Sequence, residues 1–232
     1  MPDFALRFDH PPFQLSGTVV AALLNHRLQL DALGDAVNLP PHKAPPQAPV
    51  LALRPHNALA GDGATVMLPA DAEAVQLGAS LGIVIGRPAC RVPVGQALQW
   101  VAGYTLVNDL RLPHASHYRP AVRFMARDGF CVIGPAVVPA SAIADPDALA
   151  VQIEVDGRLA QVTDTAGRLR GVAQLIADVS DFMTLQPGDL LLLGASAGAP
   201  LVRPGQQVSL HIAGLGRQQL RVAAEQPAGA RA

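Results

Sequence analysis

Uninterrupted runs of apolar residues predict three buried strands in the first half of the chain. The segments are TVVAALLNH (18–26), VLALRP (50–55) and SLGIVIG (80–86). The last two are stopped by Pro55 and Gly86, as expected of strands that end in turns. Short apolar runs bounded in this way favour strands that are buried on both faces.

Turn residues place further strands in the second half. Asp156-Gly157 separates VQIEV from RLAQV (151–162) and supplies the positive φ of a tight hairpin turn. Two Pro-Gly turns, at 186–189 and 203–206, each precede a short apolar strand, LLLLG and VSLHIAG. We therefore expect a hairpin followed by two turn-initiated strands.

Helical spacing of apolar residues is confined to three segments. The strongest is 172–185, with Val172, Leu175, Ile176, Val179 and Phe182 on one face. Residues 27–36 predict a short helix with Leu28, Leu30 and Leu33 on its apolar side. Residues 94–104 predict another with Val94, Leu98, Val101 and Ala102 close to one face. The Pro-rich segment 38–49 between them is expected to be an irregular loop, of a kind that is often functional.

Strands predominate and do not alternate regularly with helices, which excludes a doubly wound fold. The predicted class is mainly β (α+β), with mixed sheets and a few packed helices. We expect an N-terminal arm at 1–16, one domain at 17–224 and a frayed tail at 225–232.

Composition narrows the class of protein. Half of the 232 residues are hydrophobic, 15% are charged and the net charge is −1, which argues against disorder and against nucleic-acid binding. No apolar run is long enough to cross a membrane, and the N-terminus lacks a secretion signal, so a cytoplasmic protein is expected. Cys90 and Cys131 are interpreted as buried small residues.

General catalytic motifs are absent. The sequence has no Gly-x-Ser-x-Gly, phosphate loop, dinucleotide fingerprint or His-Glu-x-x-His. GASAG (194–198) has the wrong spacing for a nucleophile elbow. His114 and His117 have a spacing that suits metal binding on a helix, but Pro113 precedes them and makes such a site improbable.

The order of several sequence blocks is more informative. IVIGR (83–87), AGYTLVNDL (102–110), RDGFCVIGP (127–135), LQPGDLLLLG (185–194) and LVRPGQQVSLHIAGLG (201–216) follow one another. This order resembles the fumarylacetoacetate hydrolase family from about residue 18 onwards. The resemblance implies a β-sheet roll or sandwich whose pocket holds Mg²⁺ or Mn²⁺ through a Glu-x-Glu pair and an aspartate after Asn. The cation would chelate a 2-oxo acid and stabilise an enolate.

The chain departs from this family pattern at the metal. Asp109, after Asn108, matches the aspartate and is a candidate residual ligand, although it could instead cap backbone amides inside the fold. Gly78 and Ser80 stand at the Glu-x-Glu positions and supply no carboxylate. A hard divalent cation usually needs several oxygen ligands, so cation binding is doubtful in this chain.

A narrower resemblance lies in NHRLQLDA (25–32), PPHKAPPQAPV (40–50), LRPHNAL (53–59) and HYRPAVRFMARDGFC (117–131). These blocks resemble the N-terminal halves of family members that isomerise and decarboxylate intermediates of 4-hydroxyphenylacetate catabolism. The resemblance implies a subunit of 5-oxopent-3-ene-1,2,5-tricarboxylate decarboxylase / 2-hydroxyhepta-2,4-diene-1,7-dioate isomerase, acting on di- or tricarboxylates. The alternative is a non-catalytic subunit paired with a Glu-x-Glu-bearing paralogue, so a homodimer or a heterodimer is expected. A small-molecule sensor is a third possibility without a supporting feature.

The candidate catalytic residues are His26, Arg54 and Arg127, and the candidate substrate-binding residues are Lys43, Tyr118 and Arg119. His26 is either a general acid/base or a satisfied core histidine, and Arg54 either grips a substrate carboxylate or forms a surface pair. Arg127 either replaces a lysine that the family carries nearby or pairs with Asp128 in a turn. Lys43 either closes over the pocket on the Pro-rich loop or is a solvated lysine.

Overall fold

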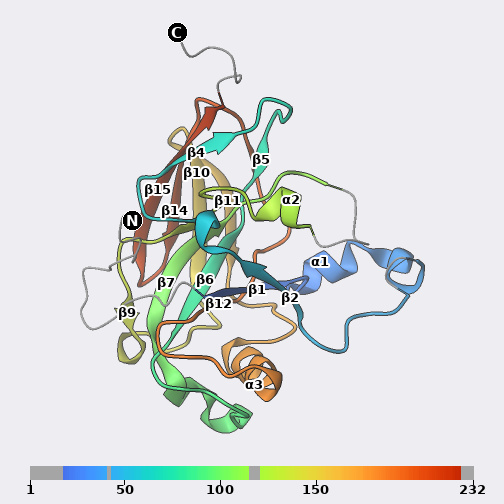
Figure 1. The fold of residues 1–232 in the computed structure, drawn as a ribbon, viewed down its shortest axis with the longest axis vertical. Coiled ribbons are helices and arrows are strands. Elements are labelled where there is room, and N and C mark those ends of the chain that lie inside the picture. Colours follow the sequence, from blue (N-terminus) through green and yellow to red (C-terminus); the bar gives the residue numbers. More distant parts are fainter. Residues whose placement is uncertain (1–17, 41–42, 115–120, 226–232) are drawn as a thin grey trace.

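The fold is described from a computed structural model, for residues 18–40, 43–114 and 121–225. Three sheets make up most of it (Figure 1). The largest has the strand order β2 (Val50–Arg54), β1 (Val19–Leu23), β12 (Leu190–Leu192), β6 (Ala79–Ile85), β7 (Val101–Asp109), β8 (Cys131–Ile133) and β3 (Leu59–Ala60), with β9 (Val138–Pro139) also paired to β7. The mainly β prediction is confirmed.

The other two sheets are smaller. The five-stranded sheet has the order β11 (Arg158–Asp164), β10 (Ala150–Val155), β14 (Gln207–Ile212), β15 (Gly216–Ala224) and β4 (Thr65–Leu68), and a third pairs β13 (Leu201–Val202) with β5 (Val75–Gln76). The predicted hairpin is β10–β11, and Asp156 and Gly157 have the expected positive φ values of 51° and 73°. Both Pro-Gly turns are closed by backbone hydrogen bonds.

The large sheet is strongly curled. Its two end strands, β2 and β3, are joined by only four residues, 55–58, which include the 3₁₀ turn η2 (His56–Ala58). In a flat sheet β2 and β7 would lie about 19 Å apart, four strand spacings, yet Arg54 of β2 bonds Asp109 of β7. We call the face on which these two side chains meet the inner face.

Two hydrophobic clusters hold these layers together. The smaller cluster lies on the inner face of the curled sheet and contains Val19, Ala21, Ala58, Val84, Val107, Cys131, Ile133, Val137, Leu190 and Leu192. The larger cluster contains residues of the two larger sheets together with the buried side of α3 (Val172–Phe182). Apolar residues therefore cover both faces of the large sheet, the smaller cluster on the inner face and the larger cluster on the opposite one.

Helices are few and short. Besides α3, the chain has α1 (Arg27–Asp31) and α2 (Val122–Met125), and the 3₁₀ segments η1 (Gly34–Asn38), η3 (Val94–Trp100) and η4 (Ala140–Ala142). In α3 the predicted apolar residues are buried except Phe182, which is 67% exposed. The helix ends at Phe182, Met183 has an extended backbone, and Leu185 pairs with Ala89 as an isolated bridge.

Two helix predictions are wrong in part. Over 94–104 only η3 is helical and Val101 already begins β7, while Val94 and Leu98 remain largely exposed. Spacing alone did not separate the end of η3 from the start of a buried strand. Over 27–36 the helix stops at Asp31, and none of its residues is buried. The prediction that Cys90 is buried is also wrong, because its side chain is exposed.

Candidate functional site

Arg54 and Asp109 form an ion pair on the inner face. Arg54 Nε donates to Asp109 Oδ1 at 2.5 Å and Nη2 donates to Oδ2 at 2.6 Å, so both carboxylate oxygens are engaged. The Arg54 side chain is 1% exposed and that of Asp109 12%. The two residues end β2 and β7, and the curl of the sheet brings these ends together.

Electrostatics keep Arg54 charged. Burial alone would lower the pKa of Arg54, but the hydrogen bond and the charge of Asp109 outweigh it and raise that pKa. Cys131 lies opposite Asp109 on β8, and burial, with the negative charge of Asp109, raises the pKa of its thiol well above the ordinary value. Cys131 is therefore a protonated, inert thiol.

Gly78 and Ser80, which the sequence resemblance aligns with a Glu-x-Glu pair, lie on the same face as Asp109. Ser80 pairs with Val107 across the ladder, and Gly78 lies beside Asp109. The Asp109 amide donates to the Gly78 carbonyl, and a Cβ at residue 78 would lie 2.0 Å from the Asp109 carbonyl oxygen. No side chain fits there unless the backbone moves. The Ser80 hydroxyl accepts from the Gly194 amide at 3.0 Å.

These residues do not fit a Mg²⁺ or Mn²⁺ centre. Within residues 18–40, 43–114 and 121–225, no group of three or more His, Cys, Asp or Glu side chains is placed to hold a metal. Both oxygens of Asp109 face Arg54, and a guanidinium cannot share them with a divalent cation without strong repulsion. The residual-ligand role predicted for Asp109 therefore competes with an ion pair already formed.

Arg111 joins this corner and was missed by the sequence analysis. It follows Asp109 by two residues and forms an isolated bridge with Gln76. Arg111 Nε donates to Gln76 Oε1 at 2.8 Å, and Gln76 Nε2 donates to the Ala199 carbonyl at 3.3 Å. The alternation of strand residues from Val107 through Asp109 to Arg111 was the pattern that could have revealed it.

His26 lies apart from this corner and caps a helix. Its Nδ1 accepts from the Leu28 amide at 3.1 Å, which makes it the N-cap of α1. Burial, followed by the charge of Arg168, lowers the pKa of His26. His26 is therefore a buried imidazole whose Nδ1 is used in capping α1.

Arg168 is a second arginine that the sequence analysis missed. It donates to the Ala195 carbonyl at 3.1 Å and to the Ser196 hydroxyl at 3.2 Å, while its Nε is buried without a partner among the described residues. Burial lowers the pKa of Arg168 to about 10. The 193–200 loop is thus held through its carbonyls by side chains from several elements: Asn25, Gln29, Gln76, Gln161 and Arg168.

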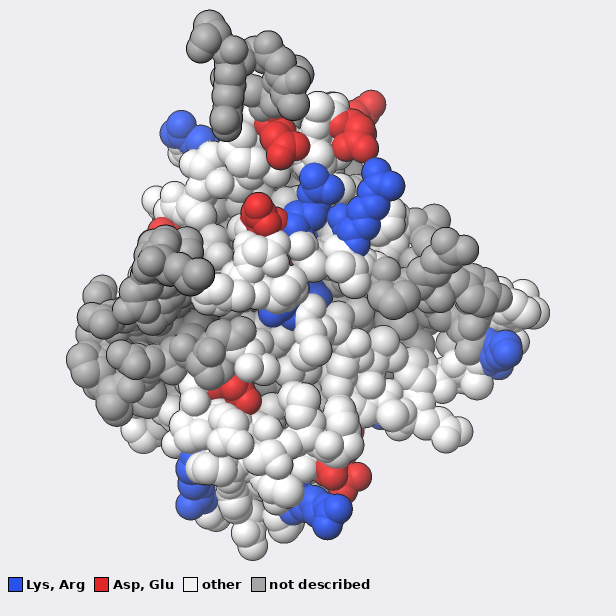
Figure 2. All heavy atoms as spheres, viewed as in Figure 1, with Lys and Arg blue, Asp and Glu red and all other residues white. Residues whose placement is uncertain are grey.

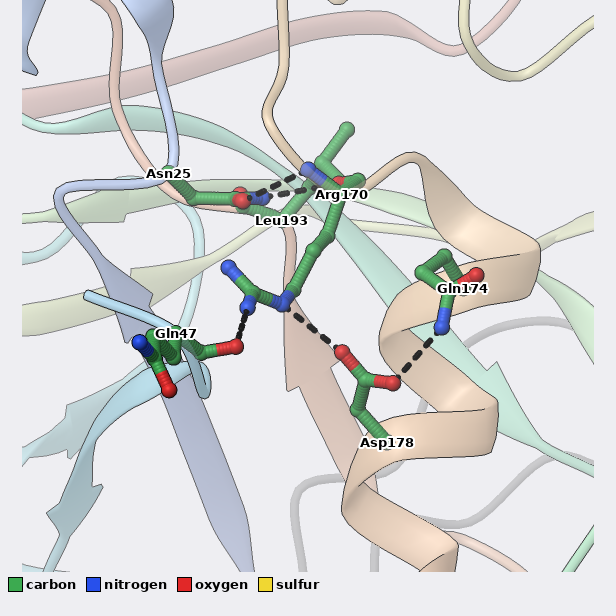
Figure 3. A network of polar contacts seen from close by, with 6 residues as sticks. All are labelled: Asn25, Gln47, Arg170, Gln174, Asp178 and Leu193. Carbon is green, nitrogen blue, oxygen red and sulfur yellow. Dashed lines mark hydrogen bonds and ion pairs between the residues drawn. The ribbon is translucent and has the colours of Figure 1, made fainter. Parts of the chain in front are cut away.

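Arg170 connects the Pro-rich loop to α3 (Figure 3). Its Nε donates to Asp178 at 2.7 Å and its Nη2 donates to the Gln47 carbonyl at 2.6 Å. The Asn25 side chain accepts from the Arg170 amide and donates to the Arg170 carbonyl. It also donates to the Leu193 carbonyl. One arginine therefore fixes the Pro-rich loop against the helix.

Of the remaining predicted residues, Arg127 and Lys43 lie in the described ranges, and neither forms a hydrogen bond or ion pair with Arg54, Asp109 or Arg111 there. Arg127 is half-buried in the turn before β8. Asp128 accepts a hydrogen bond from Asn57 and does not pair with Arg127, so the prediction of an Arg127–Asp128 pair is wrong. Lys43 is exposed, with a positive φ of 67°. Tyr118, Arg119 and His117 lie outside the described residues, and His114 stacks on Phe124.

The surface shown in Figure 2 carries few charges. Basic and acidic side chains are interspersed there, without a continuous patch of one sign. None of the helices in the described part of the chain is both long and apolar enough to cross a membrane.

Known proteins resemble this chain in sequence. The family model described as fumarylacetoacetate hydrolase C-terminal matches residues 18–223. The 4-hydroxyphenylacetate degradation bifunctional isomerase/decarboxylase of Escherichia coli is 40% identical over 84% of this chain and 44% of its own length. The chain thus spans about half the length of the curated isomerase/decarboxylases that it matches.

Two solved structures share the fold. The 5-carboxymethyl-2-hydroxymuconate delta-isomerase of Mycobacterium smegmatis is 30% identical, with a TM-score of 0.77 over 91% of this chain and 80% of that one. The maleylpyruvate hydrolase of Sphingobium sp. SYK-6, solved with manganese(II) and pyruvate, is 27% identical, with a TM-score of 0.73 over 90% and 71%.

Proposed function

Because the chain belongs to the fumarylacetoacetate hydrolase family, we propose that it is a subunit of 5-oxopent-3-ene-1,2,5-tricarboxylate decarboxylase / 2-hydroxyhepta-2,4-diene-1,7-dioate isomerase. In this proposal the metal-dependent step takes place on a second chain that carries an intact Glu-x-Glu pair. The substrates are open-chain di- and tricarboxylates.

The observation that carries this proposal is the bidentate Arg54–Asp109 pair. In this chain a guanidinium lies against the carboxylate that the family uses for its cation, and Gly78 leaves no room for a glutamate. When CO₂ leaves a carbon that is conjugated with the keto group of a 2-oxo acid, the electron pair of the broken bond moves to the keto oxygen as a dienolate. Without a cation on that oxygen the dienolate is poorly stabilised and the step is slow. The metal-dependent part of the reaction therefore belongs to the partner.

A second candidate function is a metal-independent isomerase on this chain itself. It is supported by the cationic corner, where Arg54 and Arg111 carry two positive charges against the one negative charge of Asp109. Moving a proton from an enol to carbon needs an acid/base group and cations that hold the substrate carboxylates. Among the described residues of this corner, the carboxylate is that of Asp109, and both of its oxygens accept hydrogen bonds from Arg54.

Turnover by purified chains separates these functions. The chain alone, treated with chelator, would be offered the tricarboxylate and the dienol diacid with and without Mg²⁺, and would then be mixed with a family member that carries an intact Glu-x-Glu pair. We expect no decarboxylation by the chain alone and faster turnover in the mixture than by the partner alone. Mg²⁺-dependent decarboxylation by the chain alone would overturn the proposal, whereas metal-independent isomerisation would establish the second candidate.

A further inference from the structure

Arg111 is a charged group at the inner-face corner whose donors are only partly used. Its Nε bonds Gln76, and no other hydrogen bond of this side chain reaches a residue in the described ranges. The residue is half-buried, and burial lowers the pKa of Arg111, with Arg54 adding to the effect and Asp109 opposing it. With respect to residues 18–40, 43–114 and 121–225, both terminal nitrogens thus keep their donors free for a ligand.

Its position is fixed before any ligand arrives. Two backbone hydrogen bonds of 2.8 and 3.1 Å pair Arg111 with Gln76, and the Gln76 side chain binds both the Arg111 Nε and the Ala199 carbonyl. A guanidinium held through Nε presents its two terminal nitrogens as a fork, which matches a carboxylate.

The local charge favours an anion. Arg54 neutralises Asp109 through two short hydrogen bonds, so that carboxylate does not compensate Arg111 as well. The corner therefore retains about one positive charge in a partly desolvated setting, where charge-assisted hydrogen bonds are stronger than in open water.

We infer that this corner is an anion site, in which Arg111 binds one carboxylate of an organic dicarboxylate at the place where other family members are expected to hold a cation. The inference rests on the proposed function only for the class of ligand. Arg54 acts as a positioning residue that neutralises Asp109 by pairing with it, and Gln76 orients the fork of Arg111.

The test measures binding rather than turnover. Succinate would be titrated calorimetrically at low ionic strength into the wild-type chain, Arg111→Gln and Arg111→Lys. Arg158→Gln, a change at an exposed arginine on β11, is the matched control. We expect the control to bind like the wild type and Arg111→Gln to bind about tenfold more weakly or worse, with Arg111→Lys in between. Circular dichroism and melting temperature would establish that each variant is folded.

Several outcomes would overturn the inference. These are equal affinity of Arg111→Gln and the wild type, absence of a binding heat at millimolar succinate, and an electron paramagnetic resonance signal of bound Mn²⁺ that succinate displaces. If no turnover is found with any partner but succinate binding depends on Arg111, the proposed function fails and this site stands. If turnover occurs but succinate binding does not depend on Arg111, the proposed function stands and the anion-site inference fails.

Discussion

The guanidinium of Arg54 lies against the carboxylate of Asp109 through two hydrogen bonds of 2.5 and 2.6 Å, and this contact closes the curled sheet. The two strands that carry these residues are four positions apart in the sheet order. The pair is therefore a structural cross-link as well as the feature that defines the chemistry of the corner.

Removing one partner of this pair should be costly. Arg54→Met leaves a carboxylate buried without its cation, which typically lowers the free energy of unfolding by about 3–5 kcal/mol. The double variant Arg54→Met/Asp109→Leu should lose less than the sum of the single changes. Urea unfolding measures both quantities. Arg123→Met, in the exposed pair of Arg123 with Asp71 at 3.6 Å, should stay close to the wild type. Additive losses at Arg54 and Asp109 would mean that the pair is not energetically coupled.

Gly78 should tolerate no side chain. A Cβ at this residue would lie 2.0 Å from the carbonyl oxygen of Asp109, so Gly78→Ala must displace backbone in a buried ladder. We expect a loss of about 1–3 kcal/mol or more, measured by urea unfolding. Gly95→Ala is the control, because nothing lies within 4 Å of its Cβ position. Wild-type stability of Gly78→Ala would instead mean that the backbone yields there and that a glutamate could be accommodated.

Much of the fold could be predicted from the sequence because its strands and turns are local. Runs such as 80–86 and the Asp156-Gly157 turn carry their own structural preference, and both were found where predicted. The boundary between η3 and β7 could not be predicted, because apolar spacing over 94–104 is compatible with either structure and packing decides it.

The site was only partly predictable, for a different reason. Arg54 and Asp109 were each identified singly, but their contact depends on a curl that joins strands 55 residues apart in the chain. Arg111 could not be predicted because it lies beyond the recognised motif, and its place beside Asp109 depends on the long-range bridge to Gln76. The capping role of His26 follows from the start of α1, a local feature that could not be told from a general acid/base by residue type alone.

His26 should make the protein less stable in acid. Its pKa is lowered in the folded state by burial and by Arg168, so the unfolded chain binds the proton more readily. This contribution to stability is complete above the unfolded pKa of about 6.5 and is lost as the pH falls below that value. His26→Asn keeps a capping acceptor without a titrating group, and its unfolding free energy should fall less between neutral and mildly acidic pH.

The control for this comparison is His211→Asn, an exposed residue of β14. It should keep the wild-type pH dependence. An unchanged pH profile in His26→Asn would remove His26 as the cause.

The Pro-rich loop should loosen when Arg170 is removed. Arg170→Met loses the hydrogen bonds to Asp178 and to the Gln47 carbonyl, but leaves the backbone contacts with Asn25 in place. Charge-assisted bonds of this kind contribute about 1.5–3 kcal/mol each, so amide hydrogen exchange over residues 43–50 should accelerate. Asp178→Asn keeps the Gln47 contact and should accelerate exchange less. Equal exchange in Arg170→Met and the wild type would show that the loop is held by other contacts, and the link from α3 to this loop through Arg170 would then have no effect on its order.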